Sequence, residues 1–405
     1  MSAEEGLLSE VTVLDVTQVV AGSFASMALA DMGAEVIKIE RPDGGDIGRS
    51  MPPFVGEMSS YFSAVNRNKR SVAVDLSTAD GQTIIRNLAA EADVLVENHP
   101  AGRMAKFGLD YDALSEVNPA IIYCSITGFG QTGPYASIPA LDMMAQAMSG
   151  HMSLTGPPDG KPYRAGLPIG DLTGSMYAVS SILGALYKRA IGNGEGQYID
   201  VSMTDGLIAW LSVRAGYTFA TGEAYPRTGN ALQEYVPYDV FETADGYLAV
   251  IVATEAHWRK LCTGIGRPEL AEDDRFATMA DRREHREAVT DHLSEALADR
   301  SAIEWFETLA PDGVPIAPVY DTKEVWADDH VTARGLKQEL SVSGESFGAI
   351  DFPVKFSETP TSIRRGVPKL GADTRELLTA HGYDDETIAQ LIADGVVGTP
   401  ETVDD

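Results

Sequence analysis

One carboxylate near the middle of the chain lies where it could act as a nucleophile. Asp171 follows the Gly- and Pro-rich segment 165–170 and precedes a long, mostly apolar run at 172–189. This run predicts a helix, so Asp171 is expected at or near a helix N-terminus, where the dipole and unpaired N–H groups favour an anion. An ionised carboxylate in a dry site can attack an acyl carbon. The plainer alternative is that Asp171 is only a helix N-cap, a common role for aspartate.

The elements around Asp171 follow an alternating pattern. Nearly continuous apolar strands predict an α/β fold with an open, Rossmann-like parallel sheet covered by helices on both faces. Ligands bind at the carboxyl ends of the strands in such sheets, and four ends are candidates: Val20 with Ala21, Arg41, Asn98 with His99, and 127–133. The expected strands are 11–16, 34–40, 71–76, 92–97, 120–126 and 198–203, and the expected helices are 23–32, 79–91, 112–117 and 172–189.

The pattern changes near residue 225. A hairpin is expected at 236–252, turning at Asp245 and Gly246, followed by helices at 256–264 and 281–310, the latter broken near 299–301. Two short helical patterns close the chain, at 372–381 and 385–394. We therefore expect four parts: the first part of a large domain at 1–204, a linker helix at 205–225, a small α/β domain at 226–325, and a return segment completing the large domain at 326–405.

Composition excludes several classes of partner. The 405 residues carry a net charge of -29, with 60 acidic against 31 basic residues, so nucleic acid and anionic membranes would be repelled. Such a balance is typical of a cytoplasmic protein from a salt-loving cell; an ordinary acidic enzyme is the alternative. The two cysteines have no CxxC spacing, which indicates a reducing compartment. No signal-peptide pattern and no membrane-length apolar run is present.

Other motifs are less specific. Residues 128–133 match GxGxxG, but Pro134 blocks the helix of a dinucleotide site, so we expect instead a loop that a ligand can approach closely. Arg41, and Arg103 with Lys106, could bind phosphates, and Phe107 could stack on a flat base. No HxxxH, HExxH or GxSxG spacing occurs, so neither a metal site nor a serine hydrolase is expected.

As a set, several blocks resemble the class III CoA-transferases, the family of formyl-CoA transferase, carnitine CoA-transferase and alpha-methylacyl-CoA racemase. They occur in the family's order across most of the first 250 residues. The blocks are 13–22, 33–42, 45–46, 66–76, 96–98, 128–135, 170–171 and 194–203.

This resemblance implies a homodimer of two interlocked open rings, with coenzyme A as part of the substrate and no tightly bound cofactor or metal. It implies that Asp171 is the catalytic aspartate and that Leu141 and Asp142 line the acyl end. The candidate CoA-binding residues are Val20, Ala21, Arg41, Asn98, His99, Arg103, Lys106 and Phe107. Two features depart from the family: Pro139 replaces a basic CoA contact of some members, and the Gly-rich lid of formyl-CoA transferase has no counterpart, its region being occupied by 229–234.

The reaction expected is CoA transfer. A racemase needs an acid/base pair across the α-carbon, and Leu141 stands where that branch has a histidine. We expect succinyl-CoA as donor and a short carboxylic or dicarboxylic acid, with mesaconate as our guess, as acceptor; the distal carboxylate could use Arg164, Arg214 or Arg227. The alternatives are a 2-methylacyl-CoA racemase and a non-catalytic acyl-CoA-binding relative.

Overall fold

The computed structural model of the protein describes residues 6–342 and 344–403, which divide into two compact units. The first contains the described residues up to His151, then Arg164–Ala220 and those from Ala333 onward. The second contains Met152–Tyr163 and Thr221–Thr332. The second unit thus takes up a short segment that immediately precedes the approach to Asp171.

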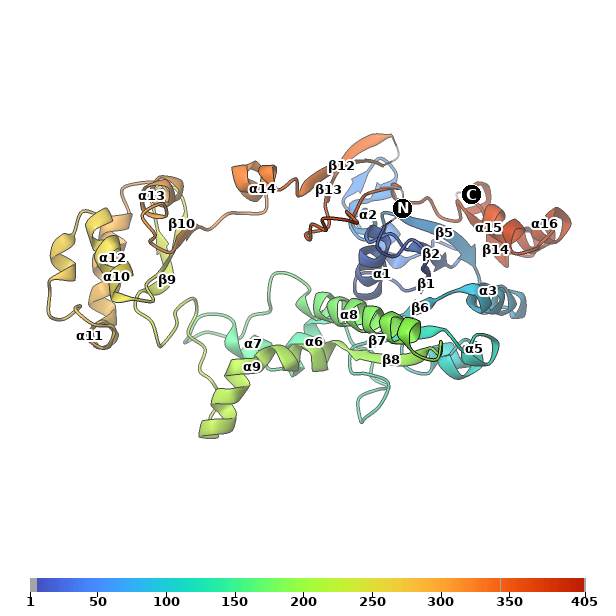
Figure 1. Cartoon of the computed structure of the whole chain (residues 1–405), viewed down its shortest axis with the longest axis horizontal. Helices are drawn as coiled ribbons and strands as arrows, with labels where there is room; N and C mark the ends of the chain where they lie inside the picture. The colour runs from blue at the N-terminus through green and yellow to red at the C-terminus, as the bar shows by residue number, and fades with distance from the viewer. Residues whose placement is uncertain (1–5, 343, 404–405) are drawn as a thin grey trace. The chain divides into compact units, whose positions relative to one another are not determined.

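The first unit is built on a sheet that, within the described residues, has seven strands in the order β14-β5-β2-β1-β6-β7-β8 (Figure 1). Neighbouring strands are parallel except at one edge, where β14 runs antiparallel to β5. The predicted α/β fold with a parallel-rich sheet is confirmed. The strands are β1 (Thr12–Val16), β2 (Glu35–Glu40), β5 (Lys69–Val74), β6 (Val94–Glu97), β7 (Ile122–Thr127), β8 (Gln197–Ser202) and β14 (Val397–Gly398).

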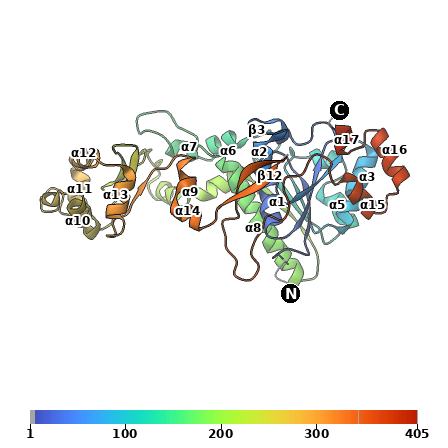
Figure 2. The ribbon, with the colours of Figure 1, turned by 90° about the horizontal axis from the view of Figure 1, so that it is seen from above.

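Helices cover both faces of this sheet. On one face lie α1 (Ala21–Asp31) and α8 (Ile169–Ile191), whose buried side chains form one core with alternate strand residues. The opposite face carries α3 (Ala79–Glu91), α5 (Tyr111–Val117), α15 (Thr374–Ala380) and α16 (Asp385–Ala393), which enclose a second core (Figure 2). Successive strand side chains point to opposite faces, so Val13 packs in the first core and Leu14 in the second.

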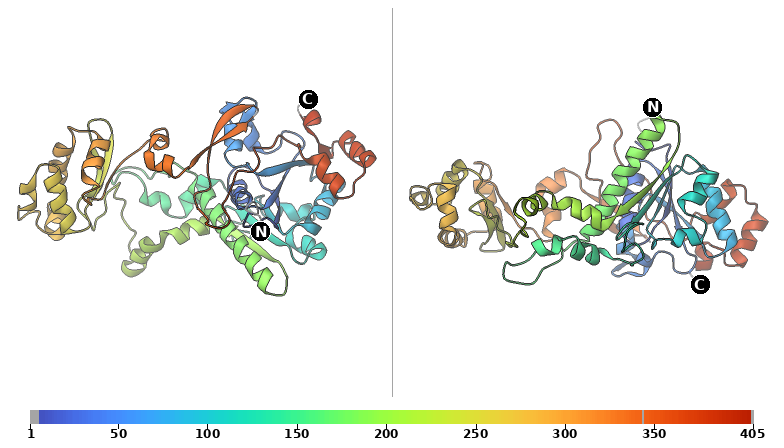
Figure 3. Two further views of the ribbon diagram at one scale, coloured as in Figure 1. Left: turned by 45° about the horizontal axis from the view of Figure 1, so that its top comes forward. Right: turned by 90° about the horizontal axis from the view of Figure 1, so that it is seen from below.

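Short elements complete the first unit. The hairpin of β12 (Lys337–Val342) and β13 (Glu345–Ile350) lies beside the early segment that contains β3 (Phe54–Val55), β4 (Met58–Ser59) and α2 (Ser60–Ser63) (Figure 3). The two segments share a small core that includes Phe62 of α2 and Leu340 of β12. The other elements here are η1 (Ile47–Ser50), α4 (Arg103–Lys106), α6 (Asp142–Met148) and α17 (Pro400–Val403). Three elements contain a boundary between the units: α7 (His151–Leu154), α9 (Met203–Thr221) and α14 (Asp329–Ala333).

The second unit has an antiparallel sheet of order β11-β10-β9. The predicted hairpin is formed by β9 and β10, and the long helical run is interrupted where Ser301 caps a new helix through a capping box. Trp258, Phe276 and Trp305 are buried in its core. Its elements are β9 (Tyr238–Glu242), β10 (Tyr247–Ile251), α10 (Glu255–Gly264), η2 (Pro268–Ala271), α11 (Met279–Glu284), α12 (Arg286–Leu297), α13 (Ala302–Leu309), β11 (Ile316–Pro318) and η3 (Glu324–Ala327).

Among the described residues, no helix combines the length and the apolar character needed to cross a bilayer.

The central strands are not as apolar as the sequence analysis assumed. On the face covered by α1, Asp15, Lys38 and Lys69 are fully buried. The Lys69 ammonium lies 2.8 Å from the Asp15 carboxylate, and the Lys38 ammonium lies 2.9 Å from that of Asp46. Burial alone would raise the pKa of Asp15, but Lys38 and Lys69 together hold the pKa of that carboxyl well below its usual range.

This buried cluster also holds the turn that follows β1. Lys38 donates to the Thr17 carbonyl at 3.0 Å, and Lys69 donates to the Ser23 carbonyl at 2.9 Å. The Thr17 N–H donates to Asp15 at 3.0 Å. The charges therefore fix the path of the chain from the end of β1 into the first turn of α1.

Removing one cation should expose how much the fold depends on this cluster. We expect Lys69→Ala to lower the free energy of unfolding by on the order of 3–5 kcal/mol, because the Asp15 carboxylate would stay buried without its nearest partner. Urea unfolding at pH 7 measures this difference. The control is Lys355→Ala, at a half-exposed residue paired with Asp351, which should change stability by less than about 1 kcal/mol. Equal effects of the two substitutions would contradict the role assigned to Lys69.

Candidate active site

A cavity of about 620 Å³ opens at the carboxyl ends of β1, β6 and β7, beside the beginning of α8. It brings together residues from distant parts of the first unit. Eight of the site residues predicted from the sequence line it: Val20, Ala21, Asn98, His99, Arg103, Leu141, Asp142 and Asp171. Thr127, Gly128 and Phe129 from the predicted loop line it as well.

The position of the cavity follows from the strand order. The chain adds β2 and β5 on one side of β1 and then β6, β7 and β8 on the other, so the order reverses between β1 and β6. A crevice forms outside the carboxyl ends of the strands at such a point. The side-chain amide of Asn98 bridges it: its Oδ1 accepts from the Gln18 N–H and its Nδ2 donates to the Gln18 carbonyl, each at 2.8 Å.

The wall next to Asn98 has a strained backbone. Val19 adopts φ = 65°, a left-handed conformation that is costly for a β-branched residue. The backbone N–H of Val19 donates to both carboxylate oxygens of Asp46, at 3.1 and 3.2 Å. Gly22 permits the turn because a Cβ there would lie 2.2 Å from the Thr17 side chain. This geometry directs the first turn of α1, which has no side-chain cap, to the cavity that Val20 and Ala21 line.

Asp171 is the third residue of α8, and the N-cap position belongs to Pro168. The N–H of Gly170 donates instead to Asp142, at 2.7 Å. Within the described residues, no group donates a hydrogen bond to the Asp171 carboxylate. The structure therefore does not support the alternative in which Asp171 serves as an N-cap, and it leaves the carboxylate open to the cavity.

The electrostatic setting of Asp171 differs from that expected at a helix N-terminus alone. Burial, and secondly the nearby Asp142 carboxylate, raise the pKa of Asp171 to about 7. The pKa of the Tyr61 hydroxyl is raised by burial and then by Asp171, and Tyr61 lines the same cavity. Near neutral pH a large share of Asp171 is ionised, yet the carboxylate is poorly stabilised and correspondingly reactive.

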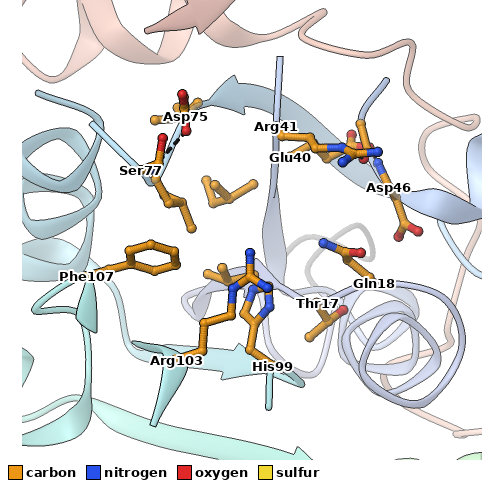
Figure 4. Close-up of a pocket in the computed structure, with 15 residues that line it drawn as sticks. Thr17, Gln18, Glu40, Arg41, Asp46, Asp75, Ser77, His99, Arg103 and Phe107 are labelled. Carbon is orange, nitrogen blue, oxygen red and sulfur yellow. Dashed lines mark hydrogen bonds between the residues drawn. The ribbon is translucent and has the colours of Figure 1, made fainter. Parts of the chain in front are cut away.

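A second cavity of about 180 Å³ adjoins the first, and the two share Gln18, His99 and Arg103. Figure 4 shows Arg41 on one side of it and Arg103 with His99 on the other, with the Phe107 ring facing inward. The Arg41 Nε donates to the Gly45 carbonyl at 3.1 Å, and the Arg103 guanidinium lies 5.8 Å from the centre of the Phe107 ring. Lys106 is exposed on α4 and lines neither cavity.

His99 lies at the junction of the two cavities. The backbone N–H of His99 donates to the Glu97 carboxylate at 2.6 Å, and this hydrogen bond fixes the loop after β6. Burial, followed by the positive charges of Arg103 and Lys38, lowers the pKa of His99 to about 4. The imidazole is therefore neutral at physiological pH and can exchange hydrogen bonds with a ligand without carrying charge.

Sequence reasoning missed several lining residues. Gln18, Val19 and Asp46 lie within the family blocks 13–22 and 45–46 but were not singled out as site residues, and Tyr61 lies outside every block. Residues 128–133 lead into turns and not into a helix, as Pro134 indicated. Among the described residues, no group of three or more His, Cys, Asp or Glu is placed to hold a metal ion.

The three arginines predicted as partners for the distal carboxylate of an acceptor lie outside the cavity that contains Asp171. In the second unit, Arg227 donates to the carbonyls of Ser153, Pro157 and Gly160, so its guanidinium serves the local fold. Arg164 donates through Nη1 to the Ala165 and Gly166 carbonyls in the segment leading to α8. Neither residue lines the cavity that contains Asp171, and neither does Arg214 on α9.

Comparisons with known proteins agree with this architecture. Residues 8–374 match the family model described as CoA-transferase family III. The chain is 40% identical to the succinate–glutarate CoA-transferase of Agrobacterium fabrum, covering 92% of this chain and 94% of that protein. It is 39% identical to the succinyl-CoA:mesaconate CoA-transferase of Haloarcula hispanica, covering 93% and 97%. A crystal structure of a CAIB/BAIF family protein from Brucella suis superposes with a TM-score of 0.87 at 36% identity, covering 93% and 100%.

The raised pKa of Asp171 makes a prediction about stability. A pKa higher in the folded than in the unfolded chain gives stability that is complete below about pH 4 and lost as the pH rises through about 7. The side chain of Asp171→Asn cannot ionise. The free energy of unfolding of this variant should therefore equal that of the parent protein near pH 4 and exceed it at pH 8. The gain should be about 1–3 kcal/mol, below the full linkage value because the side chain is partly exposed.

Urea unfolding at pH 4, 6 and 8 measures this gain. The control is Asp384→Asn: the Thr387 N–H holds the pKa of the Asp384 carboxyl below its usual range, so this variant should lose stability at pH 8 relative to pH 4. A gain for Asp171→Asn that does not change with pH would contradict the assigned electrostatics.

Proposed function

Because the chain belongs to CoA-transferase family III and is a CoA-transferase, we propose that it moves CoA from succinyl-CoA to a short dicarboxylic acid, mesaconate in our choice, through covalent intermediates on Asp171. The family resemblance inferred from the sequence is thereby confirmed. The observation that carries the proposal is the Asp171 carboxylate, which accepts no hydrogen bond from the described part of the chain and lines a cavity at three strand ends. The names of the relatives support the donor and the acceptor class.

The two adjoining cavities suit the shape of CoA. The smaller one offers Phe107 for a flat base and Arg41 with Arg103 for phosphates. The larger one leads from His99 past Val20 and Ala21 to Asp171 and could take the pantetheine arm. Lys106, exposed one turn beyond Arg103, would reach a phosphate at the rim. The thioester would then meet Asp171 between Leu141 and Asp142.

The first half of the reaction transfers CoA onto the protein. The Asp171 carboxylate attacks the thioester carbonyl of succinyl-CoA, which gives a mixed anhydride and releases the CoA thiolate. The thiolate attacks the aspartyl carbonyl of the anhydride, which leaves an aspartyl-CoA thioester and releases succinate. A carboxylate suits this role because each intermediate keeps the acyl group activated.

The second half repeats these steps with the acceptor. Its carboxylate attacks the aspartyl-CoA thioester to form a new anhydride, and the released thiolate attacks the acceptor's carbonyl, which regenerates Asp171. Each attack places negative charge on a carbonyl oxygen. The uncapped first turn of α1 presents N–H groups beside the cavity that can accept this charge. The apolar walls, including Ile126, Ile138 and Met203, limit the access of water, which would hydrolyse the intermediates.

Those apolar walls also support mesaconate, whose methyl group and double bond would contact them. The racemase alternative is disfavoured because Leu141 lines the cavity where that reaction would need a proton carrier. The non-catalytic alternative is disfavoured because Asp171 is present and open to the cavity.

We further propose that two copies interlock, with residues 1–204 and 326–405 forming the large CoA-binding domain of each. Large apolar side chains are exposed along α8 and α9, which is unusual for a surface that faces only water. They are Met176, Tyr177, Tyr187, Ile191, Ile208, Trp210, Val213 and Phe219.

The decisive experiment substitutes the nucleophile. The parent protein, Asp171→Asn and Asp171→Ala are incubated with succinyl-CoA and a panel of acids that includes mesaconate and glutarate, and the product masses are recorded. We expect mesaconyl-CoA from the parent and a loss of transfer of at least about 10³-fold in both variants, because the covalent route is closed. Calorimetry with CoA should give a dissociation constant within about threefold of the parent, since the CoA-binding residues remain.

Asp384→Asn is the matched control, because it removes a carboxylate that caps α16 and lines neither cavity, and it should retain transfer. Full activity of Asp171→Ala would refute the mechanism. Glutaryl-CoA as the main product would identify glutarate, and not mesaconate, as the acceptor. Epimerisation of a 2-methylacyl-CoA without any acid acceptor would favour the racemase.

The composition extends the proposal to a salt-rich cytoplasm, because concentrated salt screens the repulsion among charges that sum to -29. We expect light scattering in 2 M KCl to give twice the chain mass of 43.3 kDa, and the melting temperature to rise between 0.1 and 2 M KCl. A monomer mass in 2 M KCl would contradict the dimer. A melting temperature independent of KCl would contradict the adaptation to salt.

A further inference from the structure

Ser175, one turn after Asp171 on α8, is fully buried and contacts two separate parts of the site. Its hydroxyl oxygen lies 2.8 Å from the Asp171 carbonyl oxygen and 2.6 Å from the Ala21 carbonyl oxygen. Ala21 is the first residue of α1 and lines the cavity that contains the Asp171 side chain. A single hydroxyl therefore joins the backbone of Asp171 to the backbone of α1 at a residue that lines the same cavity.

The contact with Ala21 exceeds what a serine in a helix requires. Serine commonly donates to the carbonyl one turn earlier, and the Asp171 carbonyl alone would satisfy the hydroxyl. A hydroxyl has one proton, and here that proton lies between two carbonyl oxygens, the nearer of which belongs to another helix. Separating the helices would leave the Ala21 carbonyl without this donor in a region closed to water.

The two helices also approach closely at this level. Gly22 and Ser23 on α1, and Gly174 and Ser175 on α8, are all buried small residues. At Gly174, a Cβ would lie 3.1 Å from the Met203 side chain and 3.2 Å from that of Ile126, so the start of α8 is confined from the sheet side too. The Ser175 hydroxyl thus acts within a contact that leaves little room for adjustment.

We propose that Ser175 is a positioning residue for CoA transfer, which holds the Asp171 nucleophile at a fixed distance from the first turn of α1. This inference rests on the proposed function, because it concerns the attack of Asp171 on a thioester bound along α1. Its physical content is geometric: a displacement of about 1 Å between attacking oxygen and carbonyl carbon can cost about 10²-fold in rate.

The test compares Ser175→Ala with Ser175→Cys, which fills more of the volume but donates weakly. We expect kcat for succinyl-CoA-dependent transfer to fall about 10- to 100-fold in Ser175→Ala and by a smaller factor in Ser175→Cys. The dissociation constant of CoA, measured by calorimetry, should stay within about threefold of the parent. The midpoint of the acid limb of the pH–rate profile should not move, because burial and Asp142 set the ionisation of Asp171.

Ser180→Ala is the matched control. Ser180 lies on the same helix, is exposed, and donates within that helix to the Tyr177 carbonyl at 3.1 Å. Its kcat should equal that of the parent. If Ser175→Ala does not fold, Ser175→Cys decides.

Full kcat in a folded Ser175 variant would overturn the inference, as would loss of kcat accompanied by an equal loss of CoA binding or by a shifted pH midpoint. These outcomes are separate from failure of the proposed function, which would appear as transfer by Asp171→Ala. An active Asp171→Ala removes the nucleophile from the mechanism, whereas an inactive Asp171→Ala with a fully active Ser175→Ala removes only the positioning role.

Discussion

The site depends on a group of charges buried under the first turn of the fold. Asp15, Lys38, Lys69 and Asp46 are removed from water, which costs several kcal/mol per ion unless each is paired. They are paired with one another, and the two lysines also donate to backbone carbonyls on either side of the β1–α1 turn. The Asp46 carboxylate also accepts a hydrogen bond from the backbone N–H of Val19, which lies outside the cluster. A strained backbone conformation at the wall of the cavity is thus maintained by a carboxylate of the buried ion-pair cluster.

From that turn, a short series of contacts leads to Asp171, the proposed nucleophile. The turn places the first residue of α1, the Ala21 carbonyl meets the Ser175 hydroxyl, and Ser175 meets the backbone of Asp171. On the other side, Asp142 accepts from the N–H of Gly170 and adds its negative charge next to Asp171. The same carboxylate that organises the start of α8 thereby raises the pKa of Asp171, the proposed nucleophile. Stability is given up at this site, because burial of an ionised Asp171 is unfavourable, and reactivity is gained.

The two cavities are lined by small groups that come from separate segments of the chain. Arg41 and Phe107 come from segments far apart in the sequence and meet at one sheet edge because parallel strands end there together. His99 and Arg103 belong to both cavities, so a ligand that spans them would contact one continuous surface. The neutral state of His99 follows from the positive charges of Arg103 and Lys38 together with burial.

The sequence by itself determined the six parallel strands of the large sheet, their main helices and the set of strand ends, because hydrophobic periodicity and Gly or Pro punctuation are local properties of the chain. It did not indicate the antiparallel edge strand β14 or the β12–β13 hairpin. It also singled out Asp171, since a helix beginning after a flexible segment is visible in the residues, and the ordered family blocks identified the chemistry. Only the tertiary structure decided that Asn98 would bond to Gln18, that Asp46 would hold Val19, and that Ser175 would meet Ala21. These contacts join residues 27 to 154 positions apart, and no local pattern encodes such a distance. The polar character of one sheet face was hidden for the same reason: a lysine within a strand is apparent in the sequence, whereas the carboxylate that makes its burial possible is found only once the strands pair.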